Sequence, residues 1–456
     1  MKIVDRLSHW ASELGYDDLD RSAINACKSC VRDTCAVAIA GSEHTASKII
    51  RQYVEDHLPT GSCTILGTKR KGGAAAAAFA NSFSAHVWDF DDTCYAGIVH
   101  PSAVILPCIL ACGEQLGCSG KDLITAYIAG LEVQGKLGEA VSPDLFMKGW
   151  FTTSILGVIG AATAASKLCK LEPERIKSAI ALGLCRAGGM RQNNGTAAKP
   201  YTAACAAETG VHAAVLAGIG ISASGDILEG PEGFLQVYCD NKYDKGVFSR
   251  IGKPLVINEP GVALKPYPTC SGTHAAMEAA VAIMAENSLE WQDLTKVICR
   301  TTPVAVRSLK YNNPVSAEQA QFSMPYCIAC ILKMGKFDVG ELSSGALDDK
   351  DIRRLMARVE MVTTDAFESY GRSSVECPEG CEVTIQTKDG GVHVRFVGHA
   401  RGSPSAPFSI EDEWRKFSIC TRDIIDDESG KKCFERISDL ENLDDIRELT
   451  GFMVGS

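Results

Sequence analysis

Three short segments of the chain carry side chains whose types and spacing could perform chemistry. The first is WDFDDT at residues 88–93 followed by VHPS at 99–102, which brings together three aspartates, Thr93 and His100. Pro101 suits the first turn of a helix. His100 would then lie beside a helix N-terminus, where the helix dipole favours a bound anion and an imidazole exchanges protons near neutral pH.

Two other interpretations of this acidic segment stay open. One is a solvated turn at the end of a helix, which residue types alone favour over a functional site. The other is a magnesium site like that of a terpene cyclase. Such a site needs a carboxylate at the fifth position, whereas residues 91–95 read DDTCY. The spacing therefore argues against a bound metal ion.

The second segment is RQNNGTAAKP at residues 191–200. Lys199 is a lone cation at the start of an alanine-rich, nearly uncharged helix, and a cation there opposes the helix dipole. An exposed lysine near a helix start is common, but a function such as holding a carboxylate also explains the position. Arg191 is a second candidate for binding an anionic substrate.

The third segment is LKPYPTCSGTH at residues 264–274, which supplies Lys265, Tyr267, Cys270 and His274. It lies where a helical sequence pattern gives way to a mixed one, and clefts at domain junctions are favoured ligand sites. Cys270 precedes a predicted helix, so we expect a lowered thiol pKa. His274 is equally well explained as a hydrogen-bonded residue on a helix face.

The 20 cysteines predict reduced thiols rather than a disulfide scaffold. Asp5 and Arg6 interrupt the N-terminus before an apolar run can form, so we expect no signal peptide and a cytoplasmic location, with a mitochondrial one left open. CxxC pairs occur at 27–30 and 327–330. Both lie in apolar helical sequence, which favours packing of the thiols in the core over a zinc or iron–sulfur site.

The composition excludes several classes of protein. The chain has 456 residues, of which 46% are hydrophobic and 22% charged, as is typical of a folded protein with a large core. Its net charge of −10 gives no general footprint for nucleic acid or an anionic membrane. The longest apolar run, 151–166, is shorter than the roughly 18–20 residues of a membrane span. A small anionic ligand held by a local group of cations remains compatible with this charge.

A large helical part and a smaller mixed part must position the three segments. Alanine- and leucine-rich stretches predict helices up to residue 258, and runs of small residues such as AAAAAFA at 74–80 predict close helix packing. Beyond Pro254 we expect strands at 297–302, 360–364, 382–386 and 392–397, and helices at 317–333 and 349–357. We therefore predict a mainly α protein. It has a large all-α helical domain at 1–259, a smaller α+β lid domain at 260–400, and a C-terminal return to the helical domain at 401–456.

Taken together, the three segments resemble the MmgE/PrpD family. The similar stretches are AFANSFSAHVWDFDDT with HPSAVILP, TSILGVIGAATAASKL, NNGTAAKPYTAACAAETGVHAAVLA, LEGPEGF and KPYPTCSGTHAA, and the likeness covers residues 3–425. This family includes 2-methylcitrate dehydratase, cis-aconitate decarboxylase and iminodisuccinate epimerase. The resemblance implies a helical domain with an α+β lid, a homodimer, and chemistry without a metal ion, a cluster or an organic cofactor.

The resemblance also implies site residues. The family's active-site aspartate and threonine, its His-Pro-Ser histidine and its two cleft lysines fall on Asp89, Thr93, His100, Lys199 and Lys265. The chain departs from the family at two other positions, because Cys270 and Phe151 stand where family histidines are found. The loop between Thr93 and His100 is one residue longer.

The family reactions share a carbanion-like centre next to a carboxylate, and fixed cations stabilise its developing charge. We expect Lys199 and Lys265, helped by Arg191, to clamp substrate carboxylates. We expect His100 to transfer the proton, because its ordinary pKa suits general acid–base catalysis. Asp89 would orient His100, Thr93 would position a substrate oxygen, and Cys270, Tyr267 or His274 would supply the second proton.

Three functions follow from this reasoning. The first is a cofactor-independent lyase for a citrate-like tricarboxylate, of the 2-methylcitrate or alkylcitrate dehydratase type or the cis-aconitate decarboxylase type. The second is an epimerase of a small dicarboxylate such as iminodisuccinate, which would use Cys270 in two-base proton exchange. The third is a non-catalytic homologue that binds carboxylates. In each case the expected partners are a small polycarboxylate and a second copy of the chain.

Overall fold

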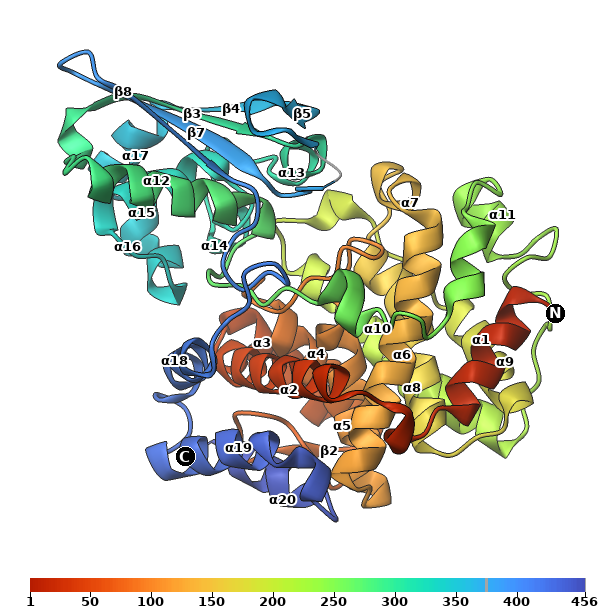
Figure 1. Cartoon of the computed structure of the whole chain (residues 1–456). Helices are drawn as coiled ribbons and strands as arrows, with labels where there is room; N and C mark the ends of the chain where they lie inside the picture. Colours follow the sequence, from red (N-terminus) through yellow and green to blue (C-terminus); the bar gives the residue numbers. More distant parts are fainter. Residues whose placement is uncertain (374–375, 456) are drawn as a thin grey trace.

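The computed structural model describes residues 1–373 and 376–455. Helices form one large body, and a smaller part built around a sheet lies against it, at the upper left of Figure 1. The predicted mainly α fold class is confirmed. The helices of the body before the lid are α1 (Ile3–Glu13), α2 (Arg21–Ser42), α3 (Thr45–His57), α4 (Ala74–His86), α5 (Ser102–Leu116), α6 (Gly120–Val141), α7 (Asp144–Met147), α8 (Thr152–Leu168), α9 (Pro173–Leu184), α10 (Ala198–Ile219) and α11 (Phe234–Cys239).

Small residues let the central helices of the body approach one another closely. Helix α8 packs against both α6 and α10. A Cβ atom at Gly210 of α10 would lie 2.5 Å from the Cβ of Ala161, and one at Gly130 of α6 would lie 2.7 Å from the Cβ of Ala164. These distances are too short for a carbon–carbon contact, so glycine is required at both positions. The predicted close packing is confirmed, and it holds together α8 and α10, whose N-terminal ends carry site residues.

The smaller part of the molecule, which we call the lid, contains a four-stranded sheet. Its spatial order is β4 (Val359–Thr363), β3 (Leu294–Thr301), β7 (Cys381–Thr387) and β8 (Val392–Val397). Strands β3 and β4 are parallel and the other pairs are antiparallel. Helices α12 (His274–Glu286), α15 (Met324–Met334) and α17 (Lys350–Met356) cover one face of this sheet (Figure 1). The shorter elements of the lid are α13 (Pro303–Ser308), α14 (Ala317–Ala320), α16 (Ser344–Leu347), β5 (Ala366–Phe367) and β6 (Arg372–Ser373).

Two local expectations need correction. The predicted helix at 317–333 is divided, because Ser323 accepts a hydrogen bond from the amide of Tyr326 and caps a new helix, with Pro325 in its first turn. The body is also not purely α, since β1 (Cys63–Thr64) and β2 (Lys71–Gly72) form a short antiparallel ribbon. The break before α15 matters for function, because it places Phe322 at the cavity described below.

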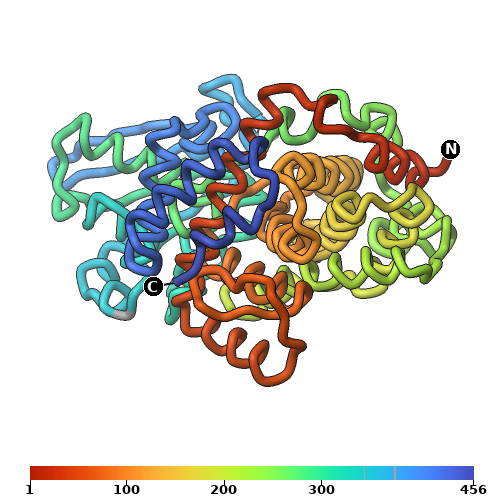
Figure 2. Tube along the Cα trace, turned by 90° about the horizontal axis from the view of Figure 1, so that it is seen from below, coloured from red at the N-terminus to blue at the C-terminus, as the bar shows by residue number. Residues whose placement is uncertain are grey.

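The C-terminal helices return to the body, where they lie beside α2 (Figure 2). They are α18 (Ile410–Thr421), α19 (Asp427–Ser438) and α20 (Arg447–Thr450), and α18 packs on α2. Ser409 and Asp412 form a capping box at the N-terminus of α18. From this helix Lys416 reaches Asp33 Oδ1 at 2.6 Å and the carbonyl oxygen of Phe90 at 2.8 Å. Through Lys416, the C-terminal segment therefore holds the acidic loop, which contains Phe90, in place.

Burial settles two further sequence interpretations. The cysteines of both CxxC pairs lie in the hydrophobic cores of the body and the lid, as packing of their thiols predicts. Among the described helices, α10 alone has the length and apolar composition to cross a membrane, so the longest apolar stretch is not 151–166. However, 56% of the apolar window of α10 is buried inside the protein. A core helix of a globular protein meets the same criteria. The length and composition of α10 are therefore only weak evidence for a membrane span.

Candidate active site

The loop after α4 carries the acidic segment and turns sharply at Asp89. Helix α4 ends at His86, and Asp89 has a φ of 49°, a left-handed conformation that aspartate tolerates better than most residues. Thr93 and Ala263 then exchange backbone hydrogen bonds of 2.9 and 2.8 Å. This pairing holds the loop beside the segment that contains Lys265. The three aspartates of the loop are buried, so the interpretation as a solvated turn is wrong.

Asp89 is the centre of a buried ion cluster. Its Oδ1 atom lies 2.7 Å from Lys199 Nζ and 3.1 Å from Lys265 Nζ. Lys265 also donates a hydrogen bond of 2.7 Å to the carbonyl oxygen of Asp89. The structure thus brings both predicted lysines together, although they converge on a carboxylate of the protein itself. A lysine has three donors, so each ammonium group retains one for a ligand.

A hydrogen-bond chain links Lys199 to a second aspartate through His86. Lys199 Nζ lies 2.7 Å from His86 Nε2, and His86 Nδ1 lies 2.7 Å from Asp91 Oδ2. An ammonium group only donates hydrogen bonds, so Nε2 of His86 accepts the hydrogen bond from Lys199. Nδ1 of His86 then carries the proton and donates a hydrogen bond to Asp91. Burial lowers the pKa of His86 further. His86 is therefore a neutral connector between Lys199 and Asp91.

His100 is held as a neutral base. Its Nδ1 atom lies 2.8 Å from the carbonyl oxygen of Asp92, which can only accept, so Nδ1 carries the proton and Nε2 the lone pair. Burial and the nearby Lys265 hold the pKa of His100 well below its ordinary value, which corrects our expectation of a pKa near neutrality. Asp89 does not orient this ring by a hydrogen bond, because its Oδ1 is 3.9 Å from His100 Nε2. The carbonyl of Asp92 does so instead.

The charges of the cluster are set by burial and by the lysines together. Burial alone would raise the pKa of Asp89, but Lys199 and Lys265 overcome it and hold that pKa well below its ordinary value. For Asp92, which has no such cation beside it, burial raises the pKa to about 7. Burial also opposes the charge on Lys265, yet Asp89 raises the pKa of that lysine overall. Anion and cations therefore stabilise one another inside the protein.

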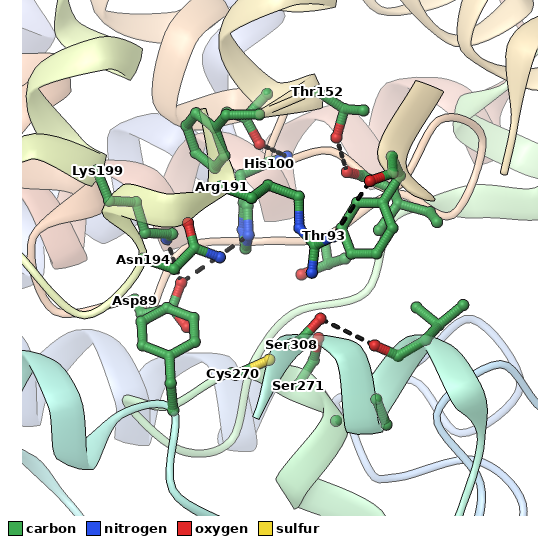
Figure 3. A pocket seen from close by; sticks show the side chains of 18 of the residues that line it. Asp89, Thr93, His100, Thr152, Arg191, Asn194, Lys199, Cys270, Ser271 and Ser308 are labelled. Atoms are coloured by element: carbon green, nitrogen blue, oxygen red, sulfur yellow. Dashed lines mark hydrogen bonds and ion pairs between the residues drawn. The ribbon is translucent and has the colours of Figure 1, made fainter. Parts of the chain in front are cut away.

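The cluster borders a small cavity between the body and the lid. In Figure 3 Lys199, Asp89 and His100 lie on the side of the body, and Cys270, Ser271 and Ser308 approach from the lid. Several buried polar atoms on the described walls have no protein partner, namely Asp89 Oδ2, Thr93 Oγ1, Arg191 Nε and Asn194 Oδ1. Buried polar groups are normally hydrogen-bonded. The cavity is therefore suited to a polar ligand.

A second, smaller cavity adjoins the first and shares Thr93, Ser271 and Glu379 with it. Lys265 and His274 line this second cavity and not the first. Among all the predicted site residues, only Tyr267 lines neither cavity. It packs against His274, with 5.4 Å between the ring centroids.

None of the three residues predicted to supply the second proton is suited to that role in the structure. Tyr267 is away from both cavities. His274 Nε2 lies 3.1 Å from Thr269 Oγ1, and burial lowers its pKa to about 3. Cys270 does line the first cavity, but burial raises its pKa to about 12, which contradicts the predicted lowering. Desolvation there outweighs the attraction of Lys265, so the thiol is neutral and is not a ready nucleophile.

Sequence reasoning missed two residues of the site. His86 ends α4 three positions before Asp89, and that spacing, inside a stretch already noted for its resemblance, is a signal that could have identified it. Glu379 lines both cavities from the lid, next to Gly380 and β7. No local pattern distinguishes this glutamate from others in the chain, and only the fold brings it to the site.

The cluster also contains a set of side chains that a metal ion could use. His86, Asp89, Asp91 and His100 offer ligand atoms that all lie within 4.8 Å of one another. The ammonium group of Lys199 already lies 2.7 Å from both His86 Nε2 and Asp89 Oδ1. Lys199 thus occupies the position of a cation, and a divalent ion would have to displace it against charge repulsion. These residues fit the lysine better than a metal ion.

Two family models together match most of the chain. The family model for the MmgE/PrpD N-terminal domain matches residues 5–245, and that for the C-terminal domain matches residues 267–440. The chain therefore belongs to the MmgE/PrpD family.

Named relatives extend over almost the whole chain. Cis-aconitate decarboxylase of Homo sapiens is 28% identical over 451 residues, which cover 95% of this chain and 90% of the relative. The cis-aconitate decarboxylase-like protein oryM of Aspergillus oryzae is 25% identical, with 99% and 97% covered. Cis-aconitate decarboxylase of Aspergillus terreus is 24% identical, with 98% and 95% covered.

Proposed function

We propose that the protein is a lyase that acts on a citrate-like tricarboxylate and removes water or carbon dioxide through proton transfer next to a carboxylate. The observation that carries this proposal is the neutral imidazole of His100 at a cavity that also presents Lys199 and Arg191. A base beside fixed cations is the arrangement that such a reaction requires. The names of the relatives favour a tricarboxylate as the substrate.

In the proposed reaction the cations bind substrate before the base acts. The free donors of Lys199 and Arg191 meet substrate carboxylates, and the hydroxyl of Thr93 meets a substrate oxygen. His100 Nε2 accepts the proton next to a carboxylate, and the developing negative charge spreads onto carboxylate oxygens close to the lysine cluster. The imidazolium that results is offset by Asp91, whose Oδ2 lies 3.5 Å from His100 Nδ1. Because lysines supply the positive charge, this proposal needs no metal ion or organic cofactor.

Epimerisation of a small dicarboxylate is the second candidate. The observation in its favour is that proton-carrying groups lie on both walls of one cavity, with His100 on the body and Cys270 on the lid. The high pKa of Cys270 counts against the thiol as the second base. Incubation in deuterium oxide separates the two reactions. An epimerase places deuterium in recovered substrate with no loss of water or carbon dioxide, whereas a lyase yields a smaller product.

The proposal is tested by incubating the protein with 2-methylcitrate, citrate, cis-aconitate, alkylcitrates and iminodisuccinate, and by reading products by mass spectrometry. His100→Gln and Lys199→Met should each lower turnover by roughly 10²–10⁴-fold, as is typical for loss of a proton-transfer or charge-stabilising group. His57→Gln, an exposed histidine, is the matched control. Near wild-type turnover in both site variants would remove the basis of the assignment. Thermal stabilisation by a tricarboxylate without any product would indicate a binding protein.

We also propose that the protein is a cytoplasmic homodimer. Apolar side chains of α10 are exposed on the single chain, where Ile219 is 77% and Val215 50% accessible. Tyr201 of the same helix is 48% accessible and lies near Tyr53 of α3. This exposed face supports contact with a second copy of the chain. Sedimentation of the wild type should give twice the mass of the chain, and Val215→Glu should give the mass of the monomer.

A further inference from the structure

Among the described residues given a chemical role so far, His100 is a base and none is a suitable acid. His100 accepts a proton at Nε2, and every version of the proposed reaction must also deliver one. In dehydration the hydroxyl leaves as water and needs a proton, and in decarboxylation a carbon takes a proton after carbon dioxide departs. Lys199 and Lys265 are bound to Asp89 and serve as fixed charges. The thiol of Cys270 holds its proton too tightly to deliver it readily.

Glu379 is the other proton-carrying group on the lid wall of this cavity. It stands two residues before β7, is partly buried, and lines both the first cavity and the second. It therefore reaches the cavity from the lid, whereas His100 is held on the body. A carboxyl group on that wall is placed to act on the face of a substrate that the base does not reach.

Hydroxyl groups hold the two oxygens of Glu379 in place. Ser271 contacts Oε1 from the lid, and Tyr95 contacts Oε2 from the loop of the body that also carries Thr93. Glu379 thus joins the two parts of the molecule across the cavity. Because both of these partners are uncharged, neither one forces the carboxyl group to be ionised, in contrast to the lysines around Asp89.

The electrostatic surroundings favour the protonated carboxyl group. Burial raises the pKa of Glu379, while the hydroxyls of Ser271 and Tyr95 and the charge of Lys265 oppose the rise and Asp89 adds to it. The titratable or charged groups that face it are Lys265, Asp89, Cys270, Tyr95, His274, His399 and Arg401. A glutamate with a raised pKa holds a proton at higher pH than usual and can still release it, as a general acid must.

We propose that Glu379 is the catalytic acid of this site and delivers the second proton from the lid. This inference rests on the proposed function. In dehydration, His100 Nε2 takes the proton from carbon, and the electron pair of that bond forms the new carbon–carbon double bond. The carbon–oxygen bond breaks with its pair on oxygen, and the Glu379 proton completes the water molecule. In decarboxylation of an unsaturated acid such as cis-aconitate, the pair of the broken carbon–carbon bond forms a new double bond to the neighbouring carbon. The pair of the old double bond moves to the far carbon of that bond, which takes the Glu379 proton.

The test compares Glu379→Gln with wild type, using the panel member that the wild type converts. Glutamine keeps the size of the side chain and its contacts with Ser271 and Tyr95, but it cannot supply the proton. We expect kcat to fall roughly 10²–10⁴-fold with KM within a few-fold of wild type. The wild-type kcat should decline at high pH as Glu379 ionises, and this decline should be absent from the residual activity of Glu379→Gln. Glu379→Asp, which keeps the acid on a shorter side chain, should recover part of the lost activity.

Glu278→Gln is the matched control. Glu278 is also a partly buried carboxyl group of the lid with a pKa raised by burial, yet it lines neither cavity and instead accepts hydrogen bonds from the amide of Arg401. It should leave kcat and the pH profile unchanged. Both variants are checked by circular dichroism and by thermal stabilisation with the tricarboxylate, which Glu379→Gln should retain.

The outcomes separate this inference from the proposed function. No product from the wild type with any panel member overturns both. Wild-type turnover together with a fully active Glu379→Gln variant, or with the same high-pH decline in that variant, overturns only the role of Glu379. A fall in kcat that Glu278→Gln shares, or that accompanies loss of tricarboxylate binding, assigns Glu379 a structural role and also overturns the proposal.

Discussion

Replacing Asp89 with asparagine should strongly destabilise the protein. The change removes the carboxylate that Lys199 and Lys265 share at 2.7 and 3.1 Å, while asparagine keeps the shape of the side chain and tolerates the left-handed backbone. Removing one partner of a buried ion pair costs about 3–5 kcal/mol, chiefly because a buried charge loses its counterion. Here two buried ammonium groups lose the same counterion, so we expect a loss near the upper end, about 5 kcal/mol in the free energy of unfolding.

The measurement is urea unfolding at pH 7.5 of the wild type, Asp89→Asn and the control Asp348→Asn, which changes an exposed aspartate. A tricarboxylate should stabilise Asp89→Asn more than the wild type, because its carboxylate can replace the missing counterion. Ligand at a hundred times its dissociation constant adds about 2.7 kcal/mol, which is enough to recover half of the loss. The reasoning is refuted if Asp89→Asn loses less than about 1 kcal/mol or if the anion stabilises both proteins equally.

Three further predictions follow from the charges around the site. Because the pKa of Asp92 is raised to about 7 in the folded protein, the free energy of unfolding should fall as pH rises from about 4 to about 7. Urea unfolding should show that this free energy falls less between pH 5 and pH 8 in Asp92→Asn than in the wild type. Cys270→Ser should retain most of the turnover, and iodoacetamide at pH 8 should leave Cys270 unmodified by mass spectrometry, because its pKa is about 12. Arg307 is exposed in a cavity that Lys148 and Lys310 also line, and the described walls of this cavity carry no carboxylate. Arg307 should therefore attract the anionic substrate. Arg307→Gln should lower kcat/KM several-fold at low salt but not kcat, and should weaken the dependence of kcat/KM on ionic strength.

The sequence allowed most of the fold to be predicted because its patterns are local. Runs of small residues predicted close helix packing, and the structure confirms it where Gly210 would clash with Ala161 if it carried a side chain. The strands predicted at 382–386 and 392–397 likewise correspond to β7 and β8, which the structure pairs as antiparallel neighbours. The divided helix around Ser323 was missed because the apolar pattern continues across the break, and only the cap and Pro325 mark it.

The candidate site was predictable in its residue types but not in its charge states. Asp89, His100, Lys199 and Lys265 could be selected from three separate segments, and the fold does gather them. The prediction failed for the pKa of His100 and of Cys270, since both depend on how completely each group is removed from water. Burial is a property of the assembled molecule, and no sequence pattern near these residues reports it.

Asp89 gives a physical reason why the site can exist before substrate arrives. Two lysines that converge without a counterion would repel each other and would lose their charges to burial. The carboxylate of Asp89 prevents both effects, and its left-handed backbone aims it at the two ammonium groups. Each lysine keeps a donor for the substrate, so a bound carboxylate adds to the cluster rather than replacing Asp89. In the proposed reaction, the positive charge needed when a carbanion-like centre forms is therefore already oriented, and little reorganisation remains to be done.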